Sequence, residues 1–154
     1  MAVGPGDVAP SFTLPAVDAD GRRDISLSDH AGEIVVLIFY PGDDTAVCTR
    51  QLCAYTSDIE RFADVGARVL AMSPQSVDSH ERFAARQGGF AFPLLADEDK
   101  AVGRAYGVVG PLGFYRRSAF VVGADGRITW AHRGLTGATF TPTAQLVKAV
   151  EAAG

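Results

Sequence analysis

The sequence predicts an α/β fold, in which helices cover both faces of a mixed central sheet to form a three-layer α/β/α domain. Two observations support this prediction. Residues 34–72 have the pattern of a strand, a helix and a second strand, and the crossover of such a unit is almost always right-handed. Two apolar segments flank the turn formed by residues 123–126, which predicts an antiparallel hairpin. Alternating elements closed by one hairpin favour three layers around a mixed sheet.

The composition indicates one globular domain and argues against a nucleic-acid partner. The chain has 154 residues, of which 47% are hydrophobic and 21% are charged. It contains no internal repeat, low-complexity block or long linker, so we expect a single domain over residues 1–154. The formal net charge of -4 has the wrong sign for a phosphate-binding surface, so a nucleic-acid partner is not expected.

The sequence carries no membrane or secretion signal. Its longest purely apolar run, residues 34–40, is far shorter than the roughly 18 residues needed to cross a bilayer. The start of the chain lacks the basic residues and the apolar stretch of a signal peptide. We therefore expect no membrane span and a cytoplasmic, reducing location. Cysteine pairs there are more often catalytic, metal-binding or inert than part of a disulfide scaffold.

The first half of the chain predicts the unit that positions a site. Residues 11–14 indicate a short strand, followed by a turn over residues 18–23 around Gly21. Residues 34–40 indicate a strand that is apolar on both faces, which is typical of the middle of a parallel sheet. After Pro41, apolar residues spaced three and four apart predict an amphipathic helix over residues 46–64, ended by Gly66. Residues 68–72 indicate the next strand.

The second half predicts shorter elements. We expect a helix near residues 75–86, a short extended segment at 92–95, a helical turn near 100–106, and strands at 119–122 and 127–131. A last helix is expected over residues 142–152, with Thr141 as its cap and Pro142 as its first residue.

One cysteine lies where a thiolate is stabilised. Ligands of open α/β sheets bind beyond the carboxyl ends of the strands, which is the place of residues 41–48. If Thr45 is the N-cap, Cys48 is the third residue of the helix, where backbone N–H groups lack partners within the helix and the helix dipole is positive. The thiolate is the nucleophilic form of cysteine. Cys48 is therefore the candidate nucleophile.

A second cysteine, Cys53, lies on another face of the predicted helix. Cys48 continues the apolar face of Leu52 and Tyr55, whereas Cys53 lies with Ser57 on the other side. Cα atoms five residues apart in an ideal helix are separated by about 8.7 Å, but a disulfide needs roughly 4.4–6.8 Å. A disulfide between these cysteines therefore requires the first turns of the helix to unwind, and we expect a conformational step between the reduced and oxidised states.

Each of these features also has a purely structural interpretation. Pro41 can simply end a strand, Thr45 can only cap a helix, Cys48 can be a small buried hydrophobe and Cys53 an incidental half-exposed thiol. A tetrahedral zinc site would need four ligands. Beyond the cysteines, the obvious candidates have no zinc-finger spacing: His30, His80 and His132.

The segment Pro41-x-x-x-Thr45-x-x-Cys48, preceded by an apolar strand that ends in Phe39 and Tyr40, resembles the active-site motif of the peroxiredoxins. With Cys53 five residues after Cys48, the chain is similar to the Q-type subgroup, also called bacterioferritin comigratory proteins, whose resolving cysteine has this position. Further similarities extend the resemblance from about residue 6 to residue 152: Ser79-His80-x-x-Phe83, residues 92–97 and residues 117–122.

The resemblance implies a thioredoxin-like fold with Pro41, Thr45, Cys48 and an arginine around the peroxide. Arg117, two residues before Ala119, fits the family position best, and Arg116 is the alternative. The arginine would favour the thiolate and would hydrogen-bond a peroxide oxygen as charge develops on it. Lysine could not present the same planar set of donors.

Three positions depart from the family pattern, and one histidine is expected to have no catalytic role. Ala46, Ala119 and Gly123 replace residues that are common in the family, but none of these changes removes a reacting group, so they bear on rate and substrate preference. We expect His80 to lie on a helix surface or to serve in packing, without a catalytic role.

The implied activity is that of a thiol peroxidase, a thioredoxin-dependent peroxiredoxin that uses no metal, haem or flavin. The Cys48 thiolate would reduce hydrogen peroxide or an organic hydroperoxide and become a sulfenic acid, which Cys53 would convert to an intramolecular disulfide. Thioredoxin or a similar dithiol would reduce that disulfide. The short C-terminus offers no second resolving cysteine, which favours a monomer.

The alternatives to this function are a general disulfide oxidoreductase, a redox sensor and a purely structural module. A general disulfide oxidoreductase normally has a Cys-x-x-Cys motif, which this sequence lacks. A redox sensor would pass its oxidation to a partner protein and consume few equivalents of peroxide, whereas an enzyme would consume many with thioredoxin and its reductase. A purely structural module would show no special thiol reactivity.

Overall fold

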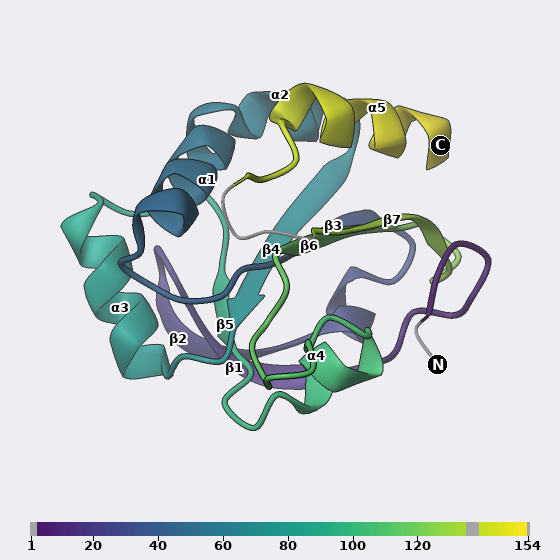
Figure 1. The fold of residues 1–154 in the computed structure, drawn as a ribbon. Coiled ribbons are helices and arrows are strands. Elements are labelled where there is room, and N and C mark those ends of the chain that lie inside the picture. Colours follow the sequence, from purple (N-terminus) through teal and green to yellow (C-terminus); the bar gives the residue numbers. More distant parts are fainter. Residues whose placement is uncertain (1–2, 135–138, 154) are drawn as a thin grey trace.

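Seven strands form one mixed sheet in this computed structural model, which describes residues 3–134 and 139–153 (Figure 1). The strand order across the sheet is β2-β1-β5-β4-β3-β6-β7. The strands are β1 Thr13–Asp18, β2 Gly21–Ser26, β3 Ile34–Phe39, β4 Ala67–Ser73, β5 Leu94–Ala96, β6 Ser118–Val122 and β7 Ile128–Arg133. The helices are η1 Leu27–His30, a 3₁₀ helix, and α1 Ala46–Ser57, α2 Ile59–Asp64, α3 Val77–Arg86, α4 Ala101–Ala105 and α5 Thr143–Ala153.

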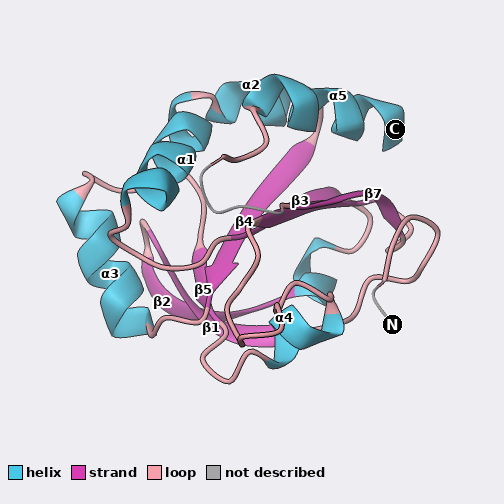
Figure 2. Cartoon of the chain, in the orientation of Figure 1, coloured by secondary structure: helices cyan, strands magenta, loops and turns pink. Residues whose placement is uncertain are grey.

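The central strand β3 is apolar on both faces because a hydrophobic core covers each face. Val36 and Ile38 pack into the core beneath α1, α2, α3 and α5, whereas Leu37 and Phe39 pack into the core on the side of η1 and α4. Figure 2 shows these two helical layers on opposite sides of the sheet. β3 pairs in parallel with β4, as the strand-helix-strand pattern predicts. The predicted α/β fold with a mixed sheet and helices on both faces is confirmed.

The neighbours of β3 differ in part from the prediction. The apolar run was expected in the middle of a parallel sheet, but β6 pairs with β3 antiparallel. A buried strand is apolar on both faces in either pairing, so its side chains do not distinguish the two arrangements.

The sequence-based prediction for the N-terminal segment places a strand and a turn there, but its bounds differ from the structure and it misses β2. β1 extends to Asp18, and the chain returns at Gly21 as β2, antiparallel to β1. The residues expected to form a turn thus belong mainly to two strands. β2 is an edge strand that leaves Arg22, Arg23 and Asp24 exposed, so it lacks the apolar alternation by which strands are recognised.

The helix predicted over residues 46–64 is two helices. Asp58, with φ -99 and ψ 13, ends α1 and precedes α2. Leu52 and Phe62 nevertheless lie in the same core, since the apolar spacing continues across the break. The last helix begins at Thr143, so Pro142 is not its first residue. The other boundaries agree with the prediction to within two residues.

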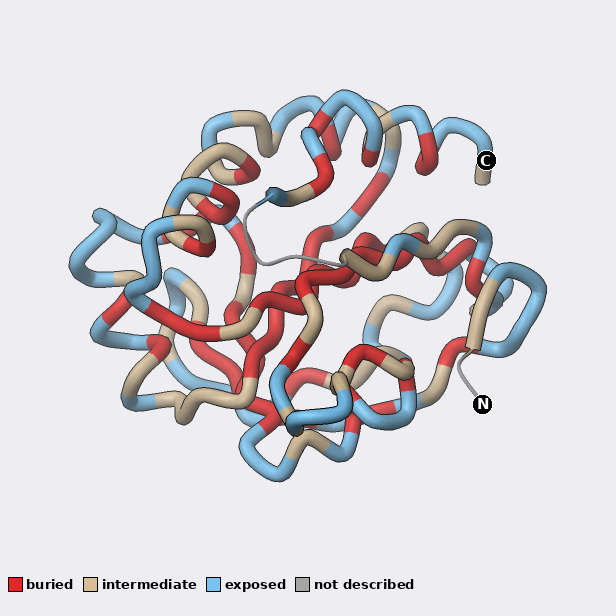
Figure 3. The backbone as a smooth tube through the Cα atoms, viewed as in Figure 1, coloured by how far each residue is buried: buried red, intermediate tan, exposed pale blue. Residues whose placement is uncertain are grey.

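The buried strands lead to one end of the sheet. Figure 3 shows the buried path of the chain through the centre of the sheet, where β3 is buried from Val35 to Phe39. Phe39 at the end of β3 lies opposite Ser118 at the start of β6. The loop that follows β3 and the residue that precedes β6 therefore meet at this end. No helix in the described part of the chain is long and apolar enough to cross a membrane.

Candidate active site

The loop between β3 and α1 forms one wall of the candidate site. The N–H of Tyr40 donates to the Met72 carbonyl at 3.0 Å, and the half-buried Pro41, which has no N–H, follows it and ends the strand. Thr45 is the N-cap of α1, as predicted, with φ -86 and ψ 151. Its hydroxyl does not cap the helix but donates to the Gly42 carbonyl at 3.2 Å. Thr45 therefore closes the loop onto itself just before the helix begins.

Cys48 lies at the start of α1 beside a cation. It is the third residue of the helix and is fully buried, with 0% exposure. Nη1 of Arg117 donates to its Sγ at 3.1 Å. A guanidinium and a helix N-terminus both favour the thiolate over the thiol. The structure thus brings Cys48 and Arg117, which are far apart in the sequence, into direct contact.

Of the two arginines left open by the sequence, Arg117 contacts the cysteine. Arg117 is buried, with 5% exposure. Nε of the neighbouring Arg116 donates instead to the Gly134 carbonyl at 3.1 Å. Adjacent residues of an extended chain send their side chains to opposite sides, so only one of the pair reaches the end of β3.

A glutamine that sequence reasoning did not single out holds the arginine. Nη1 of Arg117 also donates to Oε1 of Gln51 at 2.6 Å. Nε2 of Gln51 donates to the Tyr55 hydroxyl at 3.3 Å, and that hydroxyl donates to the Thr141 carbonyl at 2.6 Å. Burial raises the pKa of Tyr55 to about 12, so it stays a neutral donor near neutral pH. The three-residue spacing from Cys48 to Gln51 was the available signal, because residues three apart share a helix face.

A second buried cluster lies behind the loop. Asp43 accepts hydrogen bonds from the Tyr40 hydroxyl at 2.8 Å and from the Ser79 hydroxyl at 2.7 Å. Nδ1 of His80 lies 2.7 Å from the same carboxylate. His80 is 0% exposed, so its expected place on a helix surface is wrong, and packing in the interior was the correct alternative. Burial, and then the charge of Asp43, raise the pKa of the Tyr40 hydroxyl.

Cys53 lies outside this constellation. It is half-buried in the same continuous helix as Cys48, and both thiols are free. Its Sγ is 3.8 Å from Oε1 of Gln87, just after the end of α3. The reduced structure therefore keeps the two cysteines on different faces of α1, as their spacing predicts.

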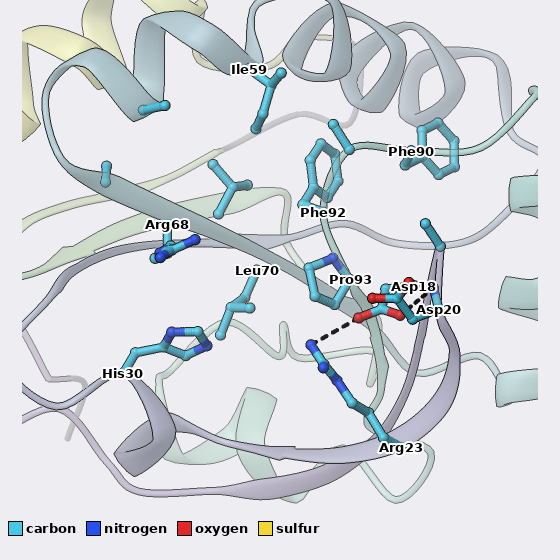
Figure 4. Close-up of a pocket in the computed structure, with 15 residues that line it drawn as sticks. Asp18, Asp20, Arg23, His30, Ile59, Arg68, Leu70, Phe90, Phe92 and Pro93 are labelled. Atoms are coloured by element: carbon cyan, nitrogen blue, oxygen red, sulfur yellow. Dashed lines mark hydrogen bonds and ion pairs between the residues drawn. The ribbon is translucent and has the colours of Figure 1, made fainter.

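Neither of two cavities in the described structure is lined by Cys48. One of about 350 Å³ lies between α2, β4 and the segment before β5 (Figure 4), and neither Cys48 nor Arg117 lines it. Its lining includes an ion pair of Arg23 and Asp18 at 2.8 Å. A smaller cavity of about 100 Å³ is bordered by Arg117 and Gln51. Among residues 3–134 and 139–153, no three histidines, cysteines or acidic residues are grouped as metal ligands.

Comparison with known proteins shows the family of this chain. A family model described as AhpC/TSA family matches residues 5–131. The chain belongs to the AhpC/TSA family. A Mycobacterium tuberculosis protein named as a peroxiredoxin is 40% identical over 134 residues, which cover 82% of this chain and 83% of that protein. Peroxiredoxin Bcp of Xanthomonas campestris is 36% identical over 132 residues, 81% of each chain. The chloroplastic peroxiredoxin Q of Triticum aestivum is 41% identical over 110 residues, 71% of this chain and 49% of that protein.

Solved structures of AhpC show the same fold. Mycobacterium tuberculosis AhpC has a TM-score of 0.89 and 24% identity, with 99% of this chain and 93% of that chain covered. Mycobacterium bovis AhpC has a TM-score of 0.90 and 23% identity, with the same shares of 99% and 93%. The predicted thioredoxin-like fold and the resemblance to peroxiredoxins are confirmed. As a member of the AhpC/TSA family with peroxiredoxin relatives, the chain is a thiol peroxidase, the predicted class of enzyme.

Proposed function

We propose that Cys48 is the peroxidatic residue and that Arg117 stabilises its thiolate and the departing oxygen. The observation that carries this assignment is the 3.1 Å hydrogen bond from Nη1 of Arg117 to Sγ of Cys48, inside a buried site at the start of α1. A guanidinium can turn donors toward both the sulfur and a peroxide oxygen, and burial strengthens both interactions because the local dielectric is low.

The chemical step is a displacement at oxygen. The Cys48 thiolate attacks one oxygen of hydrogen peroxide or an organic hydroperoxide, the S–O bond forms as the O–O bond breaks, and the other oxygen leaves as water or alcohol after taking a proton. Cys48 becomes a sulfenic acid. We assign Pro41 and Thr45 to the wall of this site, where their loop excludes water from the sulfur and bounds the space for the peroxide.

Cys53 completes the cycle as the resolving residue. Its thiolate attacks the sulfur of the sulfenic acid, a disulfide forms, and hydroxide leaves as water. Both cysteines lie in α1, so the first turns of this helix unwind for the sulfurs to meet. A dithiol of the thioredoxin type then reduces the disulfide. No metal, haem or flavin takes part in this cycle. Action as a monomer and a cytoplasmic location stay predictions from the sequence.

A count of free thiols tests the assignment. Reduced protein is mixed with one equivalent of hydrogen peroxide for a few seconds, and free cysteine serves as the control. We expect the loss of both thiols, far faster than in the control. A Cys48→Ser variant should lose all peroxide reduction. A Cys53→Ser variant should still undergo one fast oxidation but should not turn over with thioredoxin and its reductase. Turnover retained by the Cys48→Ser variant contradicts the assignment.

A further inference from the structure

A buried, hydrogen-bonded pair of side chains behind the active-site loop takes no part in the chemistry just described. The side chains of Asp43 and His80 are 1% and 0% exposed, and Oδ2 of Asp43 lies 2.7 Å from Nδ1 of His80. Nε2 of His80 lies 2.9 Å from the Leu95 carbonyl oxygen. Each ring nitrogen of His80 therefore faces an oxygen atom that can accept a hydrogen bond.

Asp43 is held through both its side chain and its backbone. The Tyr40 hydroxyl donates to Oδ1 at 2.8 Å, and the Ser79 hydroxyl donates to Oδ2 at 2.7 Å. The backbone N–H of Asp43 donates to Oε1 of Gln75 at 3.2 Å. These partners come from the end of β3, the start of α3 and the loop between β4 and α3. The middle of the active-site loop is therefore fixed to parts of the fold that lie outside α1.

Asp44, the residue after Asp43, has a backbone conformation that depends on its surroundings. Asp44 has φ 61, in the left-handed region. A residue other than glycine keeps such a conformation only where neighbouring contacts hold it. On one side of Asp44 is Asp43, which these hydrogen bonds hold, and on the other is Thr45, the N-cap of α1. The direction in which α1 starts, and with it the position of the Cys48 sulfur, follows from this short segment.

We propose that the Asp43–His80 pair positions the active site. It holds residues 41–45 and the first turn of α1 in the geometry that brings Sγ of Cys48 to Arg117. This proposal rests on the proposed function, in which α1 is folded when Cys48 attacks peroxide and unwound when Cys48 joins Cys53. The pair therefore acts oppositely on the two steps. It speeds oxidation by peroxide and slows formation of the disulfide, and it does so through the loop.

The test separates these two steps in a His80→Gln variant. Rapid mixing with hydrogen peroxide, followed by acid quenching and mass spectrometry, yields the rate constants for sulfenic acid formation and for its conversion to the disulfide. We expect oxidation to slow roughly 10- to 100-fold, since small misplacements at a reacting centre have effects of this size. Disulfide formation should become faster. A Ser79→Ala variant, which removes one donor to Asp43, should show the same two changes to a smaller extent.

The matched control is Arg22→Gln. Arg22 forms exposed ion pairs with Asp78 at 2.6 Å and Glu81 at 3.1 Å, on the same helix as His80. Breaking these pairs should leave both rate constants unchanged.

Three outcomes overturn the positioning role. They are wild-type rates in the His80→Gln variant, an equal slowing of both steps, or the same changes in the Arg22→Gln control. If His80→Gln does not fold, Ser79→Ala decides the matter: slower oxidation without slower disulfide formation supports the role, and unchanged rates contradict it. Wild-type Cys48 that reacts no faster than free cysteine contradicts the proposed function itself, independently of the variants.

Discussion

Arg117 uses one nitrogen for two acceptors, Sγ of Cys48 at 3.1 Å and Oε1 of Gln51 at 2.6 Å. Gln51 is itself held through Tyr55, whose hydroxyl donates to the Thr141 carbonyl. The guanidinium thus reaches the sulfur in a direction that neighbouring side chains set. A lysine ammonium carries the same charge but lacks the planar set of donors. At the scale of single residues, the direction of the cation matters as much as its charge.

An Arg117→Lys variant tests this view. We expect the second-order rate constant for oxidation of Cys48 by hydrogen peroxide to fall roughly 100-fold, the usual effect of removing one well-placed donor to a developing negative charge. Stopped-flow mixing measures this rate. Arg116→Lys, the neighbouring residue whose Nε contacts the Gly134 carbonyl, is the matched control and should keep the wild-type rate. Equal rates in both variants and in the wild type would remove Arg117 from the mechanism.

Helix α1 carries both cysteines, so a single element has two tasks in the proposed cycle. Its first turn must be intact for Cys48 to meet Arg117, and the same turn must open for Cys48 to reach Cys53. Helices α2 and α5 pack over the same face of the sheet, but no step of the cycle requires them to open. We therefore expect the conformational change to be confined to α1 and the loop before it.

Amide hydrogen exchange measures this confinement. After oxidation by hydrogen peroxide, the amides of residues 49–53 should exchange faster than in the reduced protein, because their helical hydrogen bonds are broken. Exchange in α5 should not change. A Cys53→Ser variant treated in the same way should keep the slow exchange of the reduced protein. Identical exchange of α1 in the reduced and oxidised wild type would show that no unwinding takes place.

A second element, α4, supports the segment that leads to Arg117. A Cβ added at Gly103 would lie 2.5 Å from a ring carbon of Tyr115, two residues before Arg117. The Tyr115 hydroxyl donates to the buried Asp97, whose carboxylate also accepts the N–H groups of Val102 and Gly103. α4 can therefore approach Tyr115 this closely because Gly103 has no side chain.

Gly103→Ala should lower the free energy of unfolding by roughly 1–3 kcal/mol, since the added methyl overpacks a filled space. Chemical denaturation measures the change. Ala105→Ser, on the exposed side of the same helix, should change stability by no more than about 0.5 kcal/mol. Wild-type stability in the Gly103→Ala variant would mean that Tyr115 moves aside without loss.

All four tyrosines of the molecule are buried: Tyr40, Tyr55, Tyr106 and Tyr115. Burial raises the pKa of each one, to about 12 for Tyr55. For Tyr40 and Tyr115, neighbouring aspartates raise the pKa further. These side chains lie in both cores, so their ionisation is a property of the whole fold.

The free energy of unfolding should therefore fall in alkaline solution. Because the folded chain holds these protons more tightly, the unfolded chain releases them first as the pH rises past about 10. The tyrosine contribution is complete below pH 10 and is lost as the pH rises through the folded pKa values. Tyr55 alone accounts for roughly 2 kcal/mol by pH 12. Urea unfolding from pH 8 to pH 11 measures the start of this fall. Phenolate absorbance that appears while the near-ultraviolet circular dichroism stays native would contradict it.

Local spacing in the sequence was enough to predict where Cys48 lies in the fold. The place of Cys48 in α1 follows from a threonine three residues before it and from the apolar spacing after it. Gln51 and the Asp43–His80 pair were not predicted, because their partners come from other parts of the chain. His80, for example, meets a residue 37 positions away.

By itself, the sequence determined the α/β class, the parallel pair β3 and β4, and the position of Cys48 at a helix start. Periodicity, turn residues and capping act over a few neighbouring positions, so they can be recognised without a structure. Only the tertiary structure decided that Arg117 rather than Arg116 meets Cys48, that β3 has an antiparallel neighbour, and that His80 is buried. These features depend on contacts between residues distant along the chain, and such contacts are set by how the layers pack together.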